Sequence, residues 1–187
     1  IDVADGHFAP AMLFFPDRVA AVARVSKVPM HVHLMVADAI LLEQINQFAD
    51  AGAAVISLHA ENAGVAGVAL DLLDRKGIAA GMVLKVETPV EAVAPYLPRL
   101  RFLTLLGTAI GVKGQGLNEK APERLRQAGK LVAASGAQHR IILAADGGIR
   151  DTTVPLLRGA GAETVVLGSL AFGAPNLQER MNWLHGL

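Results

Sequence analysis

The residues with the clearest chemical potential stand directly after short apolar segments. In the segment LAADGGIRDTT (143–153), an apolar run ends on the carboxylate of Asp146, and Gly147 and Gly148 follow it. A carboxylate at such a position is most often a turn or helix-capping residue. It could also do acid–base or metal chemistry, and glycines would then let a ligand approach the backbone. One segment alone favours the ordinary turn, so the question is whether other apolar segments end in the same way.

Other apolar segments do carry polar residues at or near their ends. These residues are Asp2, Asp5 and His7; His31 and His33; His59 and Glu61; Lys85; and Gly168 with Ser169. Two carboxylates and an imidazole that converge on one edge of a sheet would suit a divalent metal such as zinc, iron, manganese or cobalt. Glycine turns before the predicted helices 152–159 and 176–185 would suit a phosphate, because backbone N–H groups and the helix dipole favour an anion.

Each of these residues also has a purely structural interpretation. A single histidine on an apolar strand is more often a hydrogen-bonded core residue than a ligand, and we keep this interpretation for His31. His7 is interpretable as a loop residue, and Lys85 could pair with Glu87 or be solvated. His31 and His33 are two residues apart, so on a strand their side chains point to the same face. Several polar ends on one edge of one sheet favour the functional interpretation.

Short apolar segments alternate with amphipathic segments along the whole chain. The predicted strands are 1–4, 29–36, 54–58, 79–84, 102–106, 140–145 and 163–167, and the predicted helices lie near 17–26, 39–51, 64–76, 90–97, 119–136, 152–159 and 176–185. Strands this rich in Val and Ile are usually covered on both faces, which predicts a parallel sheet with helical crossovers. No segment resembles a linker, so we expect one α/β domain over residues 1–187.

The number of strand–helix units leaves two architectures open. Seven units are visible, whereas a closed (β/α) barrel usually has eight. The chain is therefore either an open doubly wound sheet or a barrel that is N-terminally incomplete, with its first β/α unit before residue 1.

Composition excludes several classes of protein. Hydrophobic residues make up 52% of the 187 residues, and 17 Lys and Arg balance 17 Asp and Glu. The absence of a basic stripe argues against nucleic acid or an anionic membrane as a partner. The chain has no cysteine, which excludes disulfides, thiolate metal sites and a cysteine nucleophile. It also lacks an apolar run of about 18 residues and a basic, apolar leader, so we expect neither a membrane span nor a signal peptide.

Seven motifs, in order along essentially the whole chain, resemble the ribulose-phosphate 3-epimerase family. They are IDVADGHFAP (1–10), HVHLMV (31–36), ISLHAE (56–61), GMVLKVETPVE (81–91), IGVKGQG (110–116), ADGGI (145–149) and VVLGSLAF (165–172). The resemblance implies a (β/α)8 TIM barrel and favours it over the open sheet. It implies an isomerase that epimerises a ketose phosphate of the ribulose 5-phosphate and xylulose 5-phosphate type at C3. A cytoplasmic homo-oligomer without nucleic-acid or membrane partners is expected.

The resemblance also implies roles for individual residues. Asp2 and Asp146 would act as base and acid on opposite faces of the substrate, passing through an enediolate, and His33 would join them in holding a divalent metal. A fourth ligand of the family, a histidine, would precede the first residue. The implied substrate and phosphate contacts are Met35, Gly111, Gly114, Gln115, Gly147, Gly148, Gly168 and Ser169.

The chain departs from the family pattern at several positions. Ala4 and Leu106 stand where methionine is typical, His31 replaces an aspartate, Lys85 replaces an asparagine, and Lys113 replaces a glycine of the lid loop. A second hypothesis is therefore a non-catalytic or differently specific sugar-phosphate-binding barrel. A third is a metal-free phosphate-binding barrel, such as a decarboxylase or an aldolase-like enzyme, in which Lys85 would be the working group.

Overall fold

The computed structural model describes residues 1–112, 114–137 and 139–187. Within these ranges the strands form one eight-stranded sheet in the order β2-β1-β3-β4-β5-β6-β7-β8. The strands are β1 (Asp2–Asp5), β2 (Met12–Leu13), β3 (Met30–Met35), β4 (Ala53–His59), β5 (Ala79–Leu84), β6 (Phe102–Leu106), β7 (Ile142–Asp146) and β8 (Thr164–Val165). All pairs are parallel except β1 with β2, which is antiparallel.

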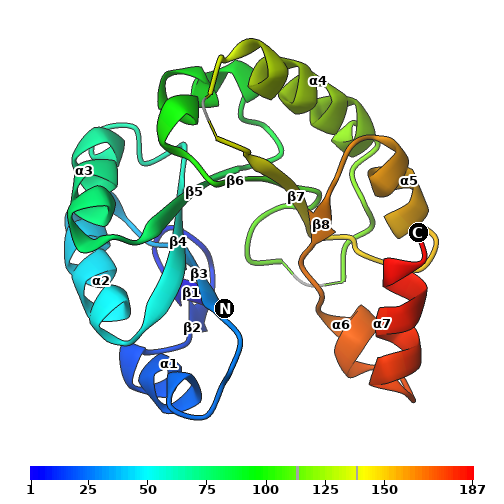
Figure 1. Ribbon diagram of the computed structural model, residues 1–187, viewed down its shortest axis with the longest axis horizontal. Helices are drawn as coiled ribbons and strands as arrows, with labels where there is room; N and C mark the ends of the chain where they lie inside the picture. The colour runs from blue at the N-terminus through cyan, green and yellow to red at the C-terminus, as the bar shows by residue number, and fades with distance from the viewer. Residues whose placement is uncertain (113, 138) are drawn as a thin grey trace.

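Helices follow the strands and cover the outer face of the sheet. They are α1 (Pro16–Ala23), α2 (Asp38–Asp50), α3 (Ala66–Lys76), the 3₁₀ helix η1 (Val90–Arg99), α4 (Ala121–Ala134), α5 (Val154–Gly159), α6 (Ser169–Phe172) and α7 (Leu177–His185). The sheet curls into an arc with α2, α3, α4 and α5 on its outside (Figure 1). The chain therefore has a barrel-type α/β fold.

The order of the strands separates the two architectures that the sequence left open. From β1 and β3 to β8, neighbours in the sheet follow one another along the chain, apart from the short β2 at the edge. A doubly wound sheet would instead reverse its strand order at a switch point. The predicted α/β barrel fold is therefore confirmed. All seven predicted strands are present, whereas the two-residue β2 and the four-residue α6 were not predicted, because elements this short leave no periodic pattern.

The helices form where apolar residues are spaced along one helix face and where a residue such as glycine can end the helix. In α2, Leu41, Ile45 and Phe48 are completely buried at the spacing of one helix face. In α3, the chain ends the helix at Gly77, whose φ of 68° is left-handed. The segment predicted as a helix near 90–97 is a 3₁₀ helix, and Pro95 and Pro98 lie inside it. Proline removes backbone N–H donors that an α-helix needs, which accounts for the difference.

Alternating side chains along β3 divide the molecule into two layers. Val32 and Leu34 are fully buried in the main core between the sheet and the outer helices. His31 and His33 lie on the opposite, concave face and line one inner cavity, as their two-residue spacing predicts. Met35 belongs to a smaller apolar cluster with Ala4 and Ala9. The main core therefore packs against the outer face of the sheet, and the histidines of β3 lie on its concave face.

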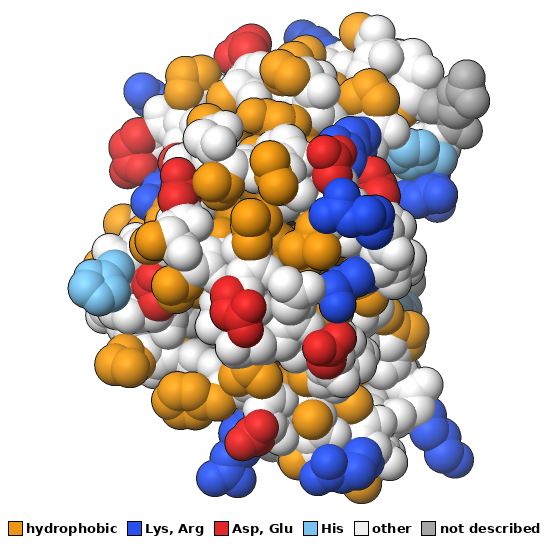
Figure 2. Space-filling view, turned by 90° about the vertical axis from the view of Figure 1, so that its left-hand side faces the viewer, with side chains coloured by type: hydrophobic (Ala, Val, Ile, Leu, Met, Phe, Trp, Pro, Cys, Tyr) orange, Lys and Arg blue, Asp and Glu red, His pale blue; other side chains and the backbone are white. Residues whose placement is uncertain are grey.

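The outer layer carries charges of both signs on the face that Figure 2 shows, over α2 and α3. Lys76 pairs with Asp50 at 3.2 Å, and Arg99 pairs with Asp71 at 2.8 Å. Exposed pairs of this kind contribute at most about 1 kcal/mol each, so the buried core supplies most of the stability. Among the helices in the described ranges, none has the length and apolar character needed to cross a membrane.

The loops after β6 and β7 pack so closely that glycine is required between them. A Cβ on Gly107 would lie 2.6 Å from the carbonyl oxygen of Gly147. A Cβ on Gly148 would lie 2.7 Å from Cα of Leu117, and Gly148 also has a φ of 69°. Both the space and the backbone conformation at Gly148 exclude a side chain.

We predict that Gly148→Ala destabilises the protein by about 1–3 kcal/mol, since the new Cβ meets backbone atoms and the left-handed conformation becomes strained. Urea unfolding measures the change. Gly67→Ala is the matched control, because nothing lies within 4 Å of a Cβ there and the residue is inside α3. That control should stabilise the protein by about 0.5–1 kcal/mol. Equal effects of the two substitutions would contradict the packing argument.

Candidate active site

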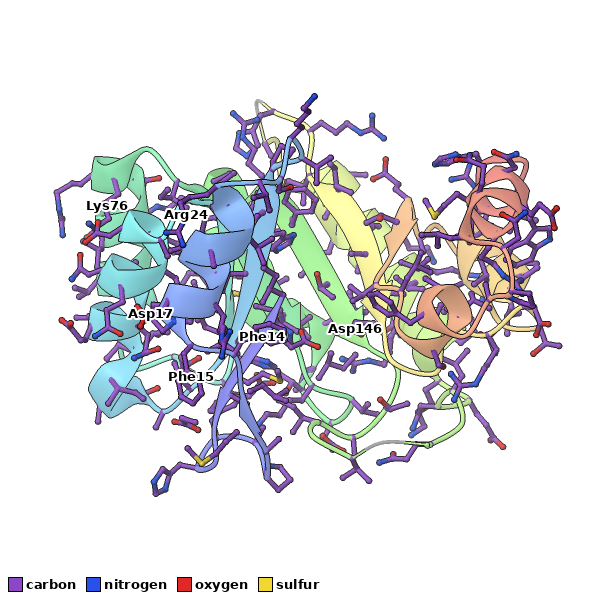
Figure 3. The ribbon with its side chains drawn as sticks, turned by 90° about the horizontal axis from the view of Figure 1, so that it is seen from below. Phe14, Phe15, Asp17, Arg24, Lys76 and Asp146 are labelled. Atoms are coloured by element: carbon purple, nitrogen blue, oxygen red, sulfur yellow. The ribbon has the colours of Figure 1, made fainter. Side chains whose placement is uncertain are left out.

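Three side chains from distant parts of the chain meet on the concave face of the sheet. One ligand atom each of Asp2, His33 and Asp146 lies within 4.8 Å of the others. Nδ1 of His33 is 3.1 Å from Oδ1 of Asp2 and 4.0 Å from Oδ2 of Asp146. We call these three residues the Asp–His–Asp cluster. In Figure 3, Asp146 lies near the middle of the curl, between the blue N-terminal strands and the orange β8.

The three residues of the cluster stand on β1, β3 and β7. Asp146 is the last residue of β7, as the sequence suggests, and Asp2 lies on β1. Register explains how they meet. Asp2 is opposite His33, and the same row runs through Ser57, Gly81 and Phe102 to Ile142, four residues before Asp146. Because strands in a curled sheet are staggered, Asp2 on β1 comes level with the end of β7.

A cleft of about 430 Å³ opens above the cluster. Six of the sequence-predicted site residues line it: Asp2, His33, Met35, Gly111, Asp146 and Gly147. Ala4 and Leu106, the positions where the resembling family has methionine, line the same cleft. The volume lies in the range of pockets that enclose small metabolites.

The remaining predicted substrate contacts lie outside the lining of this cleft. Gly114 and Gln115 belong to the same loop as Gly111, and the side chain of Gln115 accepts a hydrogen bond from Ala109 N–H at 3.2 Å. Gly148 is buried against Leu117. Gly168 and Ser169 are exposed at the start of α6. Lys113 lies outside the described residues.

The two carboxylates of the cluster have pKa values that shift in opposite directions. Burial and, as the second cause, the charge of Asp2 together raise the pKa of Asp146 to about 6. Burial also acts to raise the pKa of Asp2, but the hydrogen bond and charge of His33 outweigh it and lower the pKa below its ordinary value. At neutral pH, Asp2 therefore carries its charge readily, while Asp146 holds a proton more strongly than an ordinary aspartate does.

Two other polar residues, one on β3 and one directly after β5, have structural partners. Nε2 of His31 lies 2.7 Å from Oγ of Ser57, and the ring packs on Phe102, so His31 is a hydrogen-bonded, half-buried residue of the concave face. The ammonium of Lys85 lies 3.9 Å from the ring centre of Phe8 in a cation–π contact, and Lys85 does not line the cleft.

A further pair, His59 and Glu61, adjoins the cluster and has no role in the sequence predictions. Nε2 of His59 lies 2.8 Å from Nε2 of His33, and Nδ1 of His59 lies 2.9 Å from Oε2 of Glu61. Burial lowers the pKa of His59 to about 4. For Glu61, burial is outweighed by hydrogen bonds from His59, Thr88 and Lys85, which lower the pKa to about 2. The signal that could have drawn attention to the pair is that two polar residues stand at and just after the end of β4, the strand beside β3.

The comparisons with known proteins agree with one another. The Ribulose-phosphate 3 epimerase family matches residues 1–172. Among curated relatives, ribulose-phosphate 3-epimerase of Bacillus subtilis is 31% identical over 100% of this chain and 84% of its own length. Ribulose-phosphate 3-epimerase of Chlamydia pneumoniae is 30% identical over 95% of this chain and 76% of its own length.

Solved structures with the same fold are more distant in sequence. 3-Hexulose-6-phosphate synthase aligns with a TM-score of 0.67 and 18% identity, over 91% of this chain and 79% of its own. A mutant tryptophan synthase alpha-subunit from Pyrococcus furiosus aligns with a TM-score of 0.64 and 20% identity, over 92% of this chain and 72% of its own. At these identities the likeness concerns the fold alone.

We predict that Asp146→Asn stabilises the metal-free protein near neutral pH. A carboxyl whose pKa is raised by folding favours the folded state below its unfolded pKa of 3.8, and this stability is lost as pH rises through about 6. An amide avoids that loss, so at pH 8 the substitution should raise the free energy of unfolding by up to about 3 kcal/mol. Urea unfolding at pH 8 and pH 4 measures it. The difference should shrink towards zero at pH 4, and an equal difference at both pH values would contradict the assignment.

Proposed function

The chain belongs to the ribulose-phosphate 3-epimerase family, and from this premise we propose that it epimerises a ketose phosphate of the ribulose 5-phosphate and xylulose 5-phosphate type at C3. Its class is that of the carbohydrate epimerases, which are isomerases. The observation that carries the proposal is the Asp–His–Asp cluster beside a cleft of metabolite size.

The two carboxylates suit a reaction that removes a proton from one face of a carbon and returns one to the other face. Asp2 and Asp146 come from β1 and β7, and both line the cleft. Asp2, which is ionised at neutral pH, is suited to accept the C3 proton. Asp146, whose pKa is about 6, is suited to deliver one. In the reverse direction the two residues exchange these tasks.

The donor atoms of the cluster fit a divalent metal. Two carboxylates and one imidazole are a ligand set that zinc, iron, manganese and cobalt accept, and their atoms lie close enough together to share one ion. Asp2, His33 and Asp146 would hold it. When bound, the ion would polarise the ketone oxygen and the adjacent hydroxyl oxygen of the substrate and stabilise negative charge that develops there.

The rest of the cleft suits the remainder of a sugar phosphate. Gly111 and Gly147 line it without side chains, so backbone groups can approach the ligand. We propose that the phosphate binds beyond Gly147, towards Gly148, Gly168 and Ser169, and that the loop carrying Gly114 and Gln115 closes over the substrate and excludes water.

A binding protein without catalytic activity is a second candidate, because Ala4 and Leu106 line the cleft where the family typically has methionine. The polarisable sulfur atoms of two methionines are therefore missing from the lining. Retention of both carboxylates favours catalysis. The two candidates differ in whether the C3 proton exchanges with solvent.

We predict that ribulose 5-phosphate, incubated with the metal-loaded protein in D₂O, gains deuterium at C3 and yields xylulose 5-phosphate. Asp146→Asn should lower the turnover number by at least about 100-fold, because an amide cannot carry the proton. Proton NMR follows the exchange, and circular dichroism confirms that the variant is folded. Binding of the sugar phosphate without exchange would favour the second candidate, and wild-type turnover by Asp146→Asn would refute the two-carboxylate scheme.

We predict that His33→Ala lowers the amount of divalent metal bound per folded chain, because one of the three ligand atoms is lost. His31→Ala is the matched control: His31 lies on the same strand and face but bonds to Ser57 and is not in the cluster. Mass spectrometry of the dialysed proteins measures their zinc and manganese content. Unchanged occupancy in His33→Ala would remove His33 from the ligand set.

A further inference from the structure

We propose that Glu61 and His59 are positioning residues that fix which nitrogen of His33 faces the Asp–His–Asp cluster. Neither residue lines the cleft, and both act through the His33 ring. The consequence for metal binding rests on the proposed function, whereas the arrangement of ring protons is a property of the protein alone.

Glu61 is the anchor of this arrangement. Its Oε1 accepts hydrogen bonds from the backbone N–H of Lys85 at 3.0 Å and from the hydroxyl of Thr88. These two donors hold the carboxylate in one orientation, with Oε2 directed at Nδ1 of His59, 2.9 Å away. An ionised carboxylate only accepts hydrogen bonds, so Nδ1 of His59 must be the nitrogen that carries the proton.

The position of the proton on His59 determines which nitrogen of His33 donates a hydrogen bond. The His59 side chain is completely buried, and burial disfavours a second proton on the ring. With its proton on Nδ1, a neutral His59 presents the lone pair of Nε2 to Nε2 of His33, 2.8 Å away. Nε2 of His33 must therefore donate. Its Nδ1 is left as the nitrogen that faces Asp2 and Asp146.

Packing prevents the His59 ring from turning away. The centres of the His33 and His59 rings lie 5.0 Å apart, and the ring of Phe8 lies 4.7 Å from His59 on an inclined plane. The backbone N–H of His59 is held by Oδ1 of Asn62 at 3.2 Å. Turning the ring over would bring carbon atoms to Glu61 and His33 and would lose both hydrogen bonds.

The order of these hydrogen bonds matters for a cation because it leaves Nδ1 of His33 directed at the carboxylates. Three contacts link Glu61, His59, His33 and Asp2 in one series. Nδ1 of His33 lies 3.1 Å from Oδ1 of Asp2, and this is the position of the proposed metal. Metal-binding histidines usually have an outer-shell partner at the second ring nitrogen, and His59 takes that place here.

Glu61→Gln tests the inference with almost no change of shape. If the amide nitrogen of the new side chain faces His59, the His59 proton must move to Nε2, and His33 must take its own proton on Nδ1. If the amide oxygen faces His59 instead, the NH₂ group meets the backbone N–H of Lys85, and two donors oppose each other. Either arrangement disturbs the series of hydrogen bonds from Glu61 through His59 to Nε2 of His33. Nδ1 of His33 is then no longer kept available for a metal.

Two measurements decide the inference. In the metal-free wild-type protein, long-range ¹H–¹⁵N NMR should find the His59 proton on Nδ1 and a proton on Nε2 of His33. In a Co²⁺ titration followed by visible absorption, Glu61→Gln should bind about 10- to 100-fold more weakly than the wild type. Glu163→Gln is the matched control and should bind Co²⁺ as the wild type does. Glu163 also accepts from a backbone N–H, that of Leu143, and pairs with Arg140, but within the described residues no hydrogen bond joins it to a histidine.

The outcomes separate this inference from the proposed function. A His59 proton on Nε2 in the wild type would overturn the inference, whether or not metal binds. Wild-type Co²⁺ affinity in Glu61→Gln would also overturn it. If the wild-type protein binds no Co²⁺, the proposed metal function fails, and the NMR assignment alone decides whether Glu61 orders the two rings.

Discussion

Neighbouring strands in the curled sheet are staggered, and this stagger brings Asp2 on β1 to the level of Asp146, at the end of β7. Parallel pairing from β1 to β7 fixes the offset, because each register shifts the next strand by a set amount. The two carboxylates would not share His33 in a flat sheet. The outer helices matter to the site because their apolar faces bury the outer face of the sheet that carries it.

In the cluster two carboxylates lie close together, although each disfavours ionisation of the other. Bringing two carboxylates close together in a partly buried site makes it costly for both to be ionised. The structure separates their pKa values, with Asp2 lowered by His33 and Asp146 raised by burial. The same crowding of negative charge that separates these pKa values also makes the site attractive to a cation. Acid–base chemistry and metal binding can therefore arise from one arrangement of three side chains.

The apolar periodicity of the sequence predicted the elements that are long enough to show a period. The seven parallel strands and most helices follow from apolar periodicity, and His31 and His33 share a face because strands alternate. The short β2 and α6 carry too few residues to show a period. The 3₁₀ form of η1 depended on where its prolines lie, and the pairing of Asp2 with His33 depended on strand register. The contact of His59 with His33 could not be read from the chain, because strand pairing alone does not say how two rings are turned.

The glycines between the loops after β6 and β7 bear on how this sequence can change over time. Gly107 and Gly148 are required because neighbouring backbones leave no room for a methyl group. This requirement is independent of what the cleft binds. A descendant that lost its chemistry through drift at Asp2 or Asp146 would still lose stability if either glycine were replaced. Within the ADGGI motif, Gly148 therefore indicates that the fold is retained. Asp146 is the better indicator that catalysis is retained.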